Sequence, residues 1–506
     1  MKRTAMLVMV ALAISFTAQS QYGIPYYYLG YGSYDPYTNR FIGSSFFSLP
    51  RPTDTYTSTR IRSLAEGFKG LVRDPFTDHF RNPAWHVCEN STEVFGDFGS
   101  VNDLGKFFLG SFIHAANDSS RGMIGLNMTL DKMMKSTSKS SSENTSSSSS
   151  SRYNSSSLSE YNPERVGGRL SYSWQVSEKA DLGASYEFIS RSDGTHSEYS
   201  YGDTPPSRGS QSFQVNDDRF DGKIHTANFG SIIKSDKGVL QLFVRGTYST
   251  NALLYLYQRK ERSYYSQSTT ETRLPTDVDT KAGLIGAVYE LEHESNAVTR
   301  FLFEVAITKY TASGKINSLY ESGDTIRITF RSSVSGSSST DGTIWDIKAG
   351  VARELPISED LKGMAGFTLN YVKNTFTGND ESVTSYITTP PQTPTTQRQI
   401  LDSSLDGFDM RLPIGLEYSL SEHVLLSGGI EPRYRTGEIT EGQTSSFMNP
   451  TLSTSVYKTE NTIRGLQFST QAGVSFQKEN FGVLSVLIGK NVADMTYWSV
   501  FMRYFL

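Results

Sequence analysis

Residues 495–506, Met-Thr-Tyr-Trp-Ser-Val-Phe-Met-Arg-Tyr-Phe-Leu, decide the fold. Every second residue from Trp498 to Leu506 is apolar, whereas the residues between them include Ser499 and Arg503. A period of two places these sets on opposite faces of a β-strand. A strand with one apolar face and aromatic residues near its ends is typical of a membrane barrel, whose strands alternate between lipid and lumen.

The same pattern recurs in residues 299–310, Thr-Arg-Phe-Leu-Phe-Glu-Val-Ala-Ile-Thr-Lys-Tyr, and in residues 480–490. In the former, Phe301, Phe303, Val305 and Ile307 share one face with Lys309. The opposite face carries Arg300 and Glu304 among apolar residues. The charged Arg300 and Glu304 favour a wet lumen over a dry core on this second face.

The segments are joined by short turns at one end and long polar stretches at the other. Short turns containing Ser-Glu lie at 177–179, 358–360 and 421–423. Long polar stretches cover about 132–164, 191–220, 259–280, 311–342, 373–406 and 436–461. The stretch 132–164 consists largely of Ser, and this low-complexity composition predicts a disordered loop. Short periplasmic turns opposite long extracellular loops are typical of an outer-membrane barrel.

We therefore predict an all-β fold, a transmembrane antiparallel β-barrel over residues 94–506. About 16 candidate strands place both chain ends in the periplasm, and the soft boundaries also allow 14. A secreted β-sandwich, propeller or solenoid is the alternative. It explains the alternation but neither the unequal ends nor the apolar C-terminal strand.

Composition agrees with a large β protein. The chain has 506 residues and a net charge of −4, and 12% of its residues are aromatic. The near balance of charge argues against a nucleic-acid-binding protein. Beyond the N-terminus, the sequence shows no apolar run long enough for a membrane helix. Membrane insertion would then require a closed barrel, in which every backbone polar group is paired. The lone Cys88 cannot form an internal disulfide.

The N-terminus predicts export. Met1-Lys2-Arg3 is a basic start, an apolar run follows from Ala5 to Phe16, and small residues precede Gln21. We expect residues 1–20 to be a cleaved signal peptide, and the bacterial outer membrane to be the destination. Residues 21–93 are then an N-terminal segment rich in Tyr, Gly and Pro, with no stable periodicity.

Residues 71–84, which end in Asn82-Pro83-Ala84, precede the first candidate strand. This stretch resembles the N-terminal region of the outer-membrane long-chain fatty-acid and aromatic-hydrocarbon transporters. The resemblance implies that Asn82, Pro83 and Ala84 belong to a small hatch inside the lumen, and that the solute is hydrophobic. The following Trp85-His86 departs from that family. Without the family, the residues predict an Asn-Pro turn leading into the first strand.

Charged residues within candidate strands are the other candidate site residues. A charge that faces lipid costs about 2–4 kcal/mol at mid-membrane. We therefore expect such side chains to point into the lumen or to lie at its rims. They are Arg245, Glu304, Arg353, Glu417 and Arg433.

The sequence contains no complete enzyme motif, and we predict no catalytic residue, no metal site and no cofactor. The seven His residues lack zinc-ligand spacing, and neither a nucleophile elbow nor a phosphate-binding loop is present. The adjacent pair Asp78-His79 is the nearest approach to an acid–base unit, and it has no recognisable third member.

The predicted function is a channel or transporter for small solutes, with hydrophobic solutes implied by the resemblance. The alternative is a non-conducting anchor that displays long Ser/Thr-rich loops to partners. A hydrolase is a third class, and the missing catalytic triads disfavour it. The expected partners are membrane lipid, a hydrophobic small molecule, and the barrel assembly machinery through the C-terminal strand 495–506. No nucleic acid is expected, and the oligomeric state is open.

Overall fold

The structure is a computed structural model. It describes residues 34–35, 40–41, 57–87, 92–98, 106–117, 120–132, 136–145, 152–161, 164–204, 211–262, 267–323, 328–387, 394–449, 451–478, 481–488 and 499–505. The predicted signal peptide, Cys88 and most of residues 21–56 lie outside this part.

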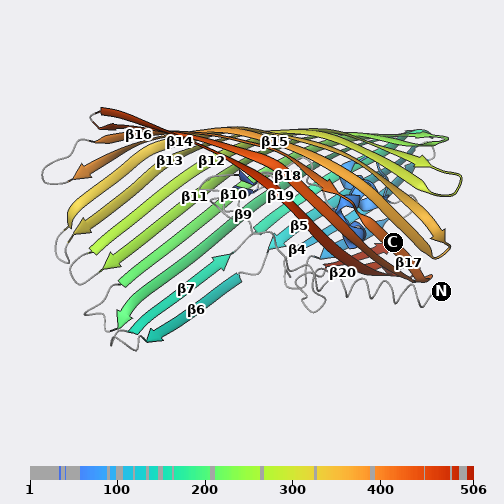
Figure 1. The fold of residues 1–506 in the computed structure, drawn as a ribbon. Helices are drawn as coiled ribbons and strands as arrows, with labels where there is room; N and C mark the ends of the chain where they lie inside the picture. Colours follow the sequence, from blue (N-terminus) through green and yellow to red (C-terminus); the bar gives the residue numbers. More distant parts are fainter. Residues whose placement is uncertain are drawn as a thin grey trace.

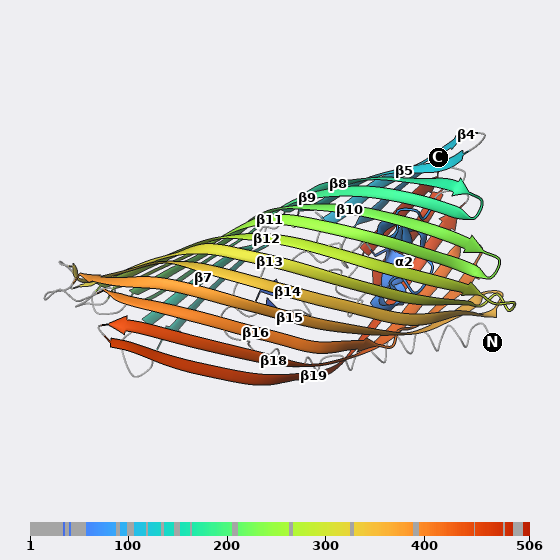
Figure 2. The same ribbon diagram turned by 90° about the horizontal axis from the view of Figure 1, so that it is seen from above.

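The chain forms a closed antiparallel β-barrel (Figures 1 and 2). Closure is made by the last strand, which pairs with the first wall strand through partners such as Phe501 and Asp97. The wall strands are β3 (Glu93–Phe98), β4 (Lys106–Asn117), β5 (Ser120–Lys132), β8 (Glu164–Ser177), β9 (Ala180–Thr204), β10 (Gln211–Ser235), β11 (Gly238–Arg262), β12 (Gln267–Glu292), β13 (Val298–Gly323), β14 (Ile328–Ser358), β15 (Leu361–Ile387), β16 (Thr395–Arg411), β17 (Ile414–Ser421), β18 (Val424–Asn449), β19 (Thr451–Lys478), β20 (Phe481–Ile488) and β21 (Ser499–Phe505).

Within the described residues, these strands make sixteen passages through the wall. Strands β16 and β17 count as one passage, because both pair with β15 on one side and β18 on the other. Sixteen agrees with the predicted strand number. The three predicted Ser-Glu turns are also confirmed, since they join β8 to β9, β14 to β15 and β17 to β18.

The face pattern predicted for 299–310 is confirmed on β13. Phe301 and Phe303 are exposed on the outside, whereas Arg300, Leu302 and Glu304 are buried inside. Outward residues stay apolar as far as Ile307, and from Lys309 to Asn317 they are polar. Met502 and Tyr504 on β21 are likewise exposed. We call this outward band the apolar belt, and it makes the chain a transmembrane barrel with the outer-membrane fold.

The wall extends far beyond the apolar belt. Strands of 25 to 31 residues are common from β9 to β15, although about 9–11 residues cross a bilayer. The polar stretches expected as loops are therefore mostly strand. Figure 1 shows this extension on the left, whereas β17 and β20 lie on the right.

Residues 132–164, for which the sequence predicts a disordered loop, contain two strands in the structure. Strands β6 (Ser136–Thr145) and β7 (Arg152–Tyr161) form a hairpin there, and β7 pairs with the far half of β9, from Arg152 with Thr204 to Tyr161 with Thr195. A Ser-rich sequence buries little apolar surface. Pairing with β9 nevertheless satisfies backbone hydrogen-bonding groups of the hairpin, so the hairpin needs no apolar core of its own.

Residues 57–87, which lie in the segment without stable periodicity, contain helices. They are α2 (Thr59–Leu64), the 3₁₀ turn η1 (Glu66–Phe68) and α3 (Pro75–Arg81). Among the described residues, no helix is long and apolar enough to cross a membrane. Two further short strands, β1 (Tyr34–Asp35) and β2 (Arg40–Phe41), pair only with each other.

Candidate functional site: the helical segment in the lumen

Residues 57–87, which we call the hatch, lie inside the barrel near its short-turn end (Figure 2). Local sequence explains the two helices. Ser58 caps α2 by accepting the Ile61 N–H, and Asp74 caps α3 by accepting the Thr77 N–H at 2.8 Å, with Pro75 in the first turn. Between them Gly70 takes a left-handed φ of +79°, which a side chain would disfavour. The sequence therefore fixes two short helices and a tight turn.

One side of the hatch packs against apolar wall residues. Ile61, Leu64, Phe68 and Leu71 are fully buried in a cluster with side chains from β11 to β15, among them Val288. A second cluster joins α3 to the first wall strands: the Phe76 ring meets Phe95 edge-on at 4.8 Å, and Phe95 stacks on Phe112 at 5.3 Å. Apolar burial thus supplies a general attraction of hatch to wall.

Charged side chains fix where the hatch sits. Arg60 on α2 binds the Glu417 carboxylate of β17 at two positions, 2.6 and 2.8 Å. Burial disfavours the Arg60 charge, but the Glu417 carboxylate outweighs this and raises the pKa of Arg60 above its ordinary value. Arg62 pairs with Asp97 of β3 at 2.5 Å. Two-point Arg–carboxylate contacts are strong and directional, so they set orientation as well as affinity.

A second set of ion pairs holds α3 against β12 and β13. Asp78 accepts a hydrogen bond from Arg300 Nη2 at 3.0 Å, and Arg300 Nε lies 2.9 Å from Glu290. Arg81 Nε lies 3.0 Å from Glu304. All five side chains are at most 6% exposed. Buried charges need such partners, because an unpaired charge there is costly.

Wall cations also cover the C-terminal end of α3, whose last carbonyl groups have no partner within the helix. Arg169 of β8 donates to the carbonyl groups of His79 and Phe80, and Arg245 of β11 donates to Phe80 at 2.8 Å. Asn228 of β10 donates to the Arg81 carbonyl at 3.0 Å. Positive groups at this end are also favoured by the helix dipole.

The Asn82-Pro83-Ala84 turn rests on two wall glycines. The Asn82 side chain accepts the Ala84 N–H at 3.0 Å and donates to the Ser231 carbonyl of β10 at 3.1 Å. A Cβ on Gly230 would lie 1.8 Å from Asn82 Oδ1, and one on Gly183 would lie 2.3 Å from the Ala84 nitrogen. The turn therefore needs a wall surface without side chains at these two positions.

His79 is fully buried next to positive charge. Burial and the nearby Arg169 lower its pKa to about 3, so the ring is neutral at neutral pH. Nδ1 lies 2.8 Å from the Trp85 carbonyl, which only accepts, so Nδ1 carries the proton. Nε2 then accepts from the Ser171 hydroxyl of β8 at 3.0 Å. The Asp78-His79 pair is thus occupied by structural contacts with the wall.

The structure brings most of the sequence-predicted charges together around the hatch. Arg245, Glu304 and Glu417 face it directly, and Arg433 lies nearby, where its Nε donates to Asp409 at 2.7 Å. Arg353 instead is exposed on the outer face near the short-turn rim. The lumen around Arg300 and Glu304 is filled rather than wet. Sequence reasoning missed Arg60, Asp78, Gly183 and Gly230 as contacts, because their partners depend on strand register.

The chain has no ready metal site among the described residues, where no group of three or more His, Cys, Asp or Glu side chains is arranged to hold an ion.

No family model and no curated protein matches the chain, so the family resemblance of residues 71–84 stays a prediction. Among solved structures, the chain is similar to the ferric-catecholate import receptor Fiu from E. coli K12, at 8% identity over 82% of each chain, with a TM-score of 0.29. It is also similar to the copper transporter OprC, at 8% identity over 83% of this chain and 81% of that one, with a TM-score of 0.27. The ferric yersiniabactin uptake receptor FyuA from Yersinia pestis has 9% identity over 82% and 80%, with a TM-score of 0.22.

Proposed function

We propose that the chain is an outer-membrane transporter in which residues 57–87 act as a movable hatch. Barrel size supports this: side chains alone fill an eight-stranded barrel, whereas 16–18 strands leave an aqueous channel. Here a helical segment fills part of the lumen of a sixteen-passage wall. No strand of the wall pairs with the described part of the hatch. The hatch is held by side-chain contacts, which can break and re-form without unravelling the barrel.

The resemblance of residues 71–84 supports hydrophobic solutes as the class carried, and the wall lacks one hydrogen-bond donor beside the hatch. Pro413, between β16 and β17, has no N–H to donate, while the Leu412 N–H donates to the Pro432 carbonyl and the Pro413 carbonyl accepts from the Gly366 N–H, both at 2.9 Å. A Cβ on the hatch residue Gly67 would lie 3.1 Å from the Pro413 ring. Leu412 and Ile414 are exposed next to this point. A solute released by the hatch could leave here into the lipid rather than into water.

Planar-bilayer conductance of residues 21–506 tests the hatch. We expect a closed or small pore in the full chain. The double variant Asp78→Asn/Arg81→Gln, which removes hatch charges from their wall partners, should open more often and more widely. Arg353→Ala is the matched control, because this charge lies on the outside. If all three stay silent while gels show heat-modifiable barrel migration, the non-conducting anchor becomes the better account.

The solute class needs its own assay. Vesicles that contain the chain should take up a hydrophobic fluorescent fatty-acid analogue faster than empty vesicles, without taking up glucose. Pro413→Ala, which restores the missing N–H donor in the wall, should slow this uptake. Faster uptake of glucose than of the analogue would exclude the hydrophobic path.

A further inference from the structure

The extension of the wall beyond the apolar belt is a sheet with two ends. Among the described residues it contains twelve strands, from β6 and β7 through β9 to β16 and on to β18 and β19, and each runs antiparallel to the next. The passages that close the barrel between β19 and β5 are β20, β21, β3 and β4, whose described parts are only 6 to 12 residues long. This is close to the length that crosses a bilayer. Beyond the belt, the sheet is therefore open on this side.

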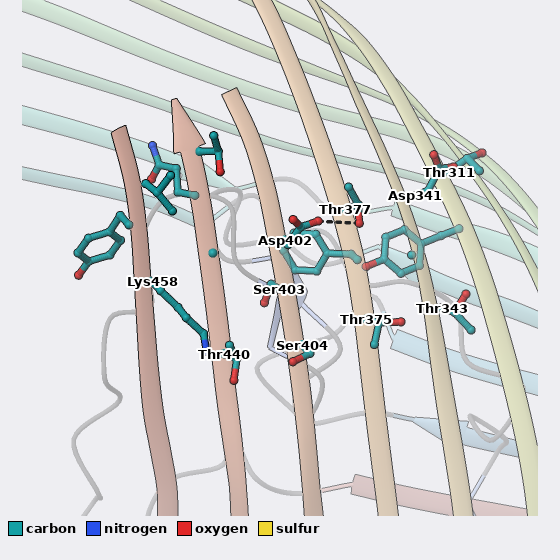
Figure 3. A pocket seen from close by; sticks show the side chains of 18 of the residues that line it. Thr311, Asp341, Thr343, Thr375, Thr377, Asp402, Ser403, Ser404, Thr440 and Lys458 are labelled. Atoms are coloured by element: carbon teal, nitrogen blue, oxygen red, sulfur yellow. Dashed lines mark hydrogen bonds between the residues drawn. The ribbon is translucent and has the colours of Figure 1, made fainter. Parts of the chain in front are cut away.

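Strands β6 and β19 border this opening with one strand edge each. β6 pairs with β7, and residues 451–471 of β19 pair with β18, but no described strand pairs with either on the other side. In Figure 1, β6 is the lowest strand of the extension, and in Figure 2, β19 is the outermost strand on the lower side. Figure 3 shows β19 from close by, with Lys458 beside Thr440 of β18. A free edge presents backbone N–H and C=O groups that can pair with a further strand.

The β19 edge lacks the features that usually prevent strand addition, which are proline, bulges and uncompensated charge. Residues 451–471 contain no proline, their ladder with β18 has no register shift, and Lys458 pairs with Glu460 at 2.7 Å. Val456 is 75% exposed, more than any other large hydrophobic side chain of the described residues, and Tyr457 is 64% exposed. These two neighbours lie on opposite faces of the strand. A strand added at this edge would therefore cover part of both side chains.

The two edges run in opposite directions, because eleven antiparallel pairings separate β6 from β19. A twofold axis along the membrane normal leaves these directions unchanged. It can therefore place β6 of each copy antiparallel to β19 of the other copy, and such self-complementary contacts close a dimer.

We propose that the chain forms a twofold dimer in which two β6–β19 ladders join the extensions of the copies. An unrelated strand would cover one edge and leave the other free, whereas a second copy covers both. The sequence of β6 suits this place, because five of its ten residues are Ser, whose small side chains leave room for Val456 and Tyr457. The proposed interface is separate from the hatch, which contacts the wall within the apolar belt.

Cross-linking between two single-cysteine forms of the mature chain tests which edges meet. Both forms carry Cys88→Ser, and one adds Ser140→Cys on β6 whereas the other adds Tyr457→Cys on β19. The two forms are mixed, reconstituted into vesicles and treated with a short bismaleimide. We expect a covalent dimer in the mixture and little in either form alone, because the axis brings β6 to β19 and keeps like edges apart. Equal cross-linking in the mixture and in the separate forms would overturn the proposed pairing.

Sedimentation of the mature chain in detergent measures the dimer itself. Tyr457→Lys puts a charge at the β19 edge, and since the contact occurs twice in a dimer, the dissociation constant should rise about tenfold. Tyr199→Lys is the matched control, because Tyr199 is a 44% exposed tyrosine on β9, whose two sides pair with β7 and β10 there. Heat-modifiable migration confirms that each variant is folded. A monomer at all concentrations, or a dimer that Tyr457→Lys weakens no more than Tyr199→Lys does, overturns the proposal.

Discussion

At the scale of single residues, Gly230 shows how closely the wall and the hatch are matched. Any side chain there would collide with Asn82 Oδ1. We expect Gly230→Ala to weaken hatch docking by about 1–3 kcal/mol, the usual effect of an overpacked contact. Hydrogen exchange of residues 75–87 should then become faster. Gly246→Ala on the next strand is the control, because a Cβ there meets nothing within 4 Å. Equal protection in both variants would show that the turn does not rest on Gly230.

His79 should make the docking of the hatch weaker at low pH. Its folded pKa, about 3, lies below the ordinary value of 6.5, so the undocked state binds more protons between these values. Docking is therefore at full strength above about pH 6.5 and weakens as the pH falls toward 3, by up to about 1.4 kcal/mol per pH unit. We expect hydrogen exchange of 75–87, relative to the barrel, to rise between pH 6.5 and 4.5. In His79→Gln, which cannot titrate, this added exchange should be absent; if it persists, another group controls it.

At the scale of elements, the pairing of α3 with β13 depends on a buried charge. Arg300→Met leaves Asp78 and Glu290 without their shared cation, and breaking a buried pair costs about 3–5 kcal/mol. Urea titration followed by hatch proteolysis should show release of residues 57–87 well before the barrel unfolds. Arg353→Ala, on the outer face of the neighbouring strand, should leave the midpoint unchanged. A hatch as resistant in Arg300→Met as in the parent chain would contradict the role of this pair.

The sequence predicts the elements of the wall better than those of the lumen. Alternation in 299–310 is a local property of one strand, so the inside position of Arg300 and Glu304 could be inferred directly. Their partners could not, because Asp78 and Arg81 lie more than 200 residues away and meet them only through barrel register. The Ser-rich strands β6 and β7 escaped prediction for a related reason. Their composition shows that they can bury little apolar surface. It does not show that β7 can pair with the far half of β9.

At the scale of the whole molecule, the barrel divides along its strands into two chemical zones. On β13 the outward residues are Phe301, Phe303, Val305 and Ile307, followed by Lys309, Thr311 and Ser313. The hatch contacts β13 at Arg300 and Glu304, within the first zone. On this strand the apolar belt and the hatch contacts therefore share one stretch, and the stretch from Lys309 to Ser313 is polar on the outside.

This division predicts where the wall tolerates charge. Val305→Arg places a charge on the outward face within the apolar belt, where it should cost about 2–4 kcal/mol at mid-membrane. Ser313→Arg, on the same face of the same strand but outside the belt, should cost almost nothing. Refolding into vesicles over a urea series, read by heat-modifiable migration, measures both. Val305→Arg should shift the folded fraction to lower urea, and Ser313→Arg should follow the parent chain. Equal shifts would move the membrane boundary on β13 beyond Ser313.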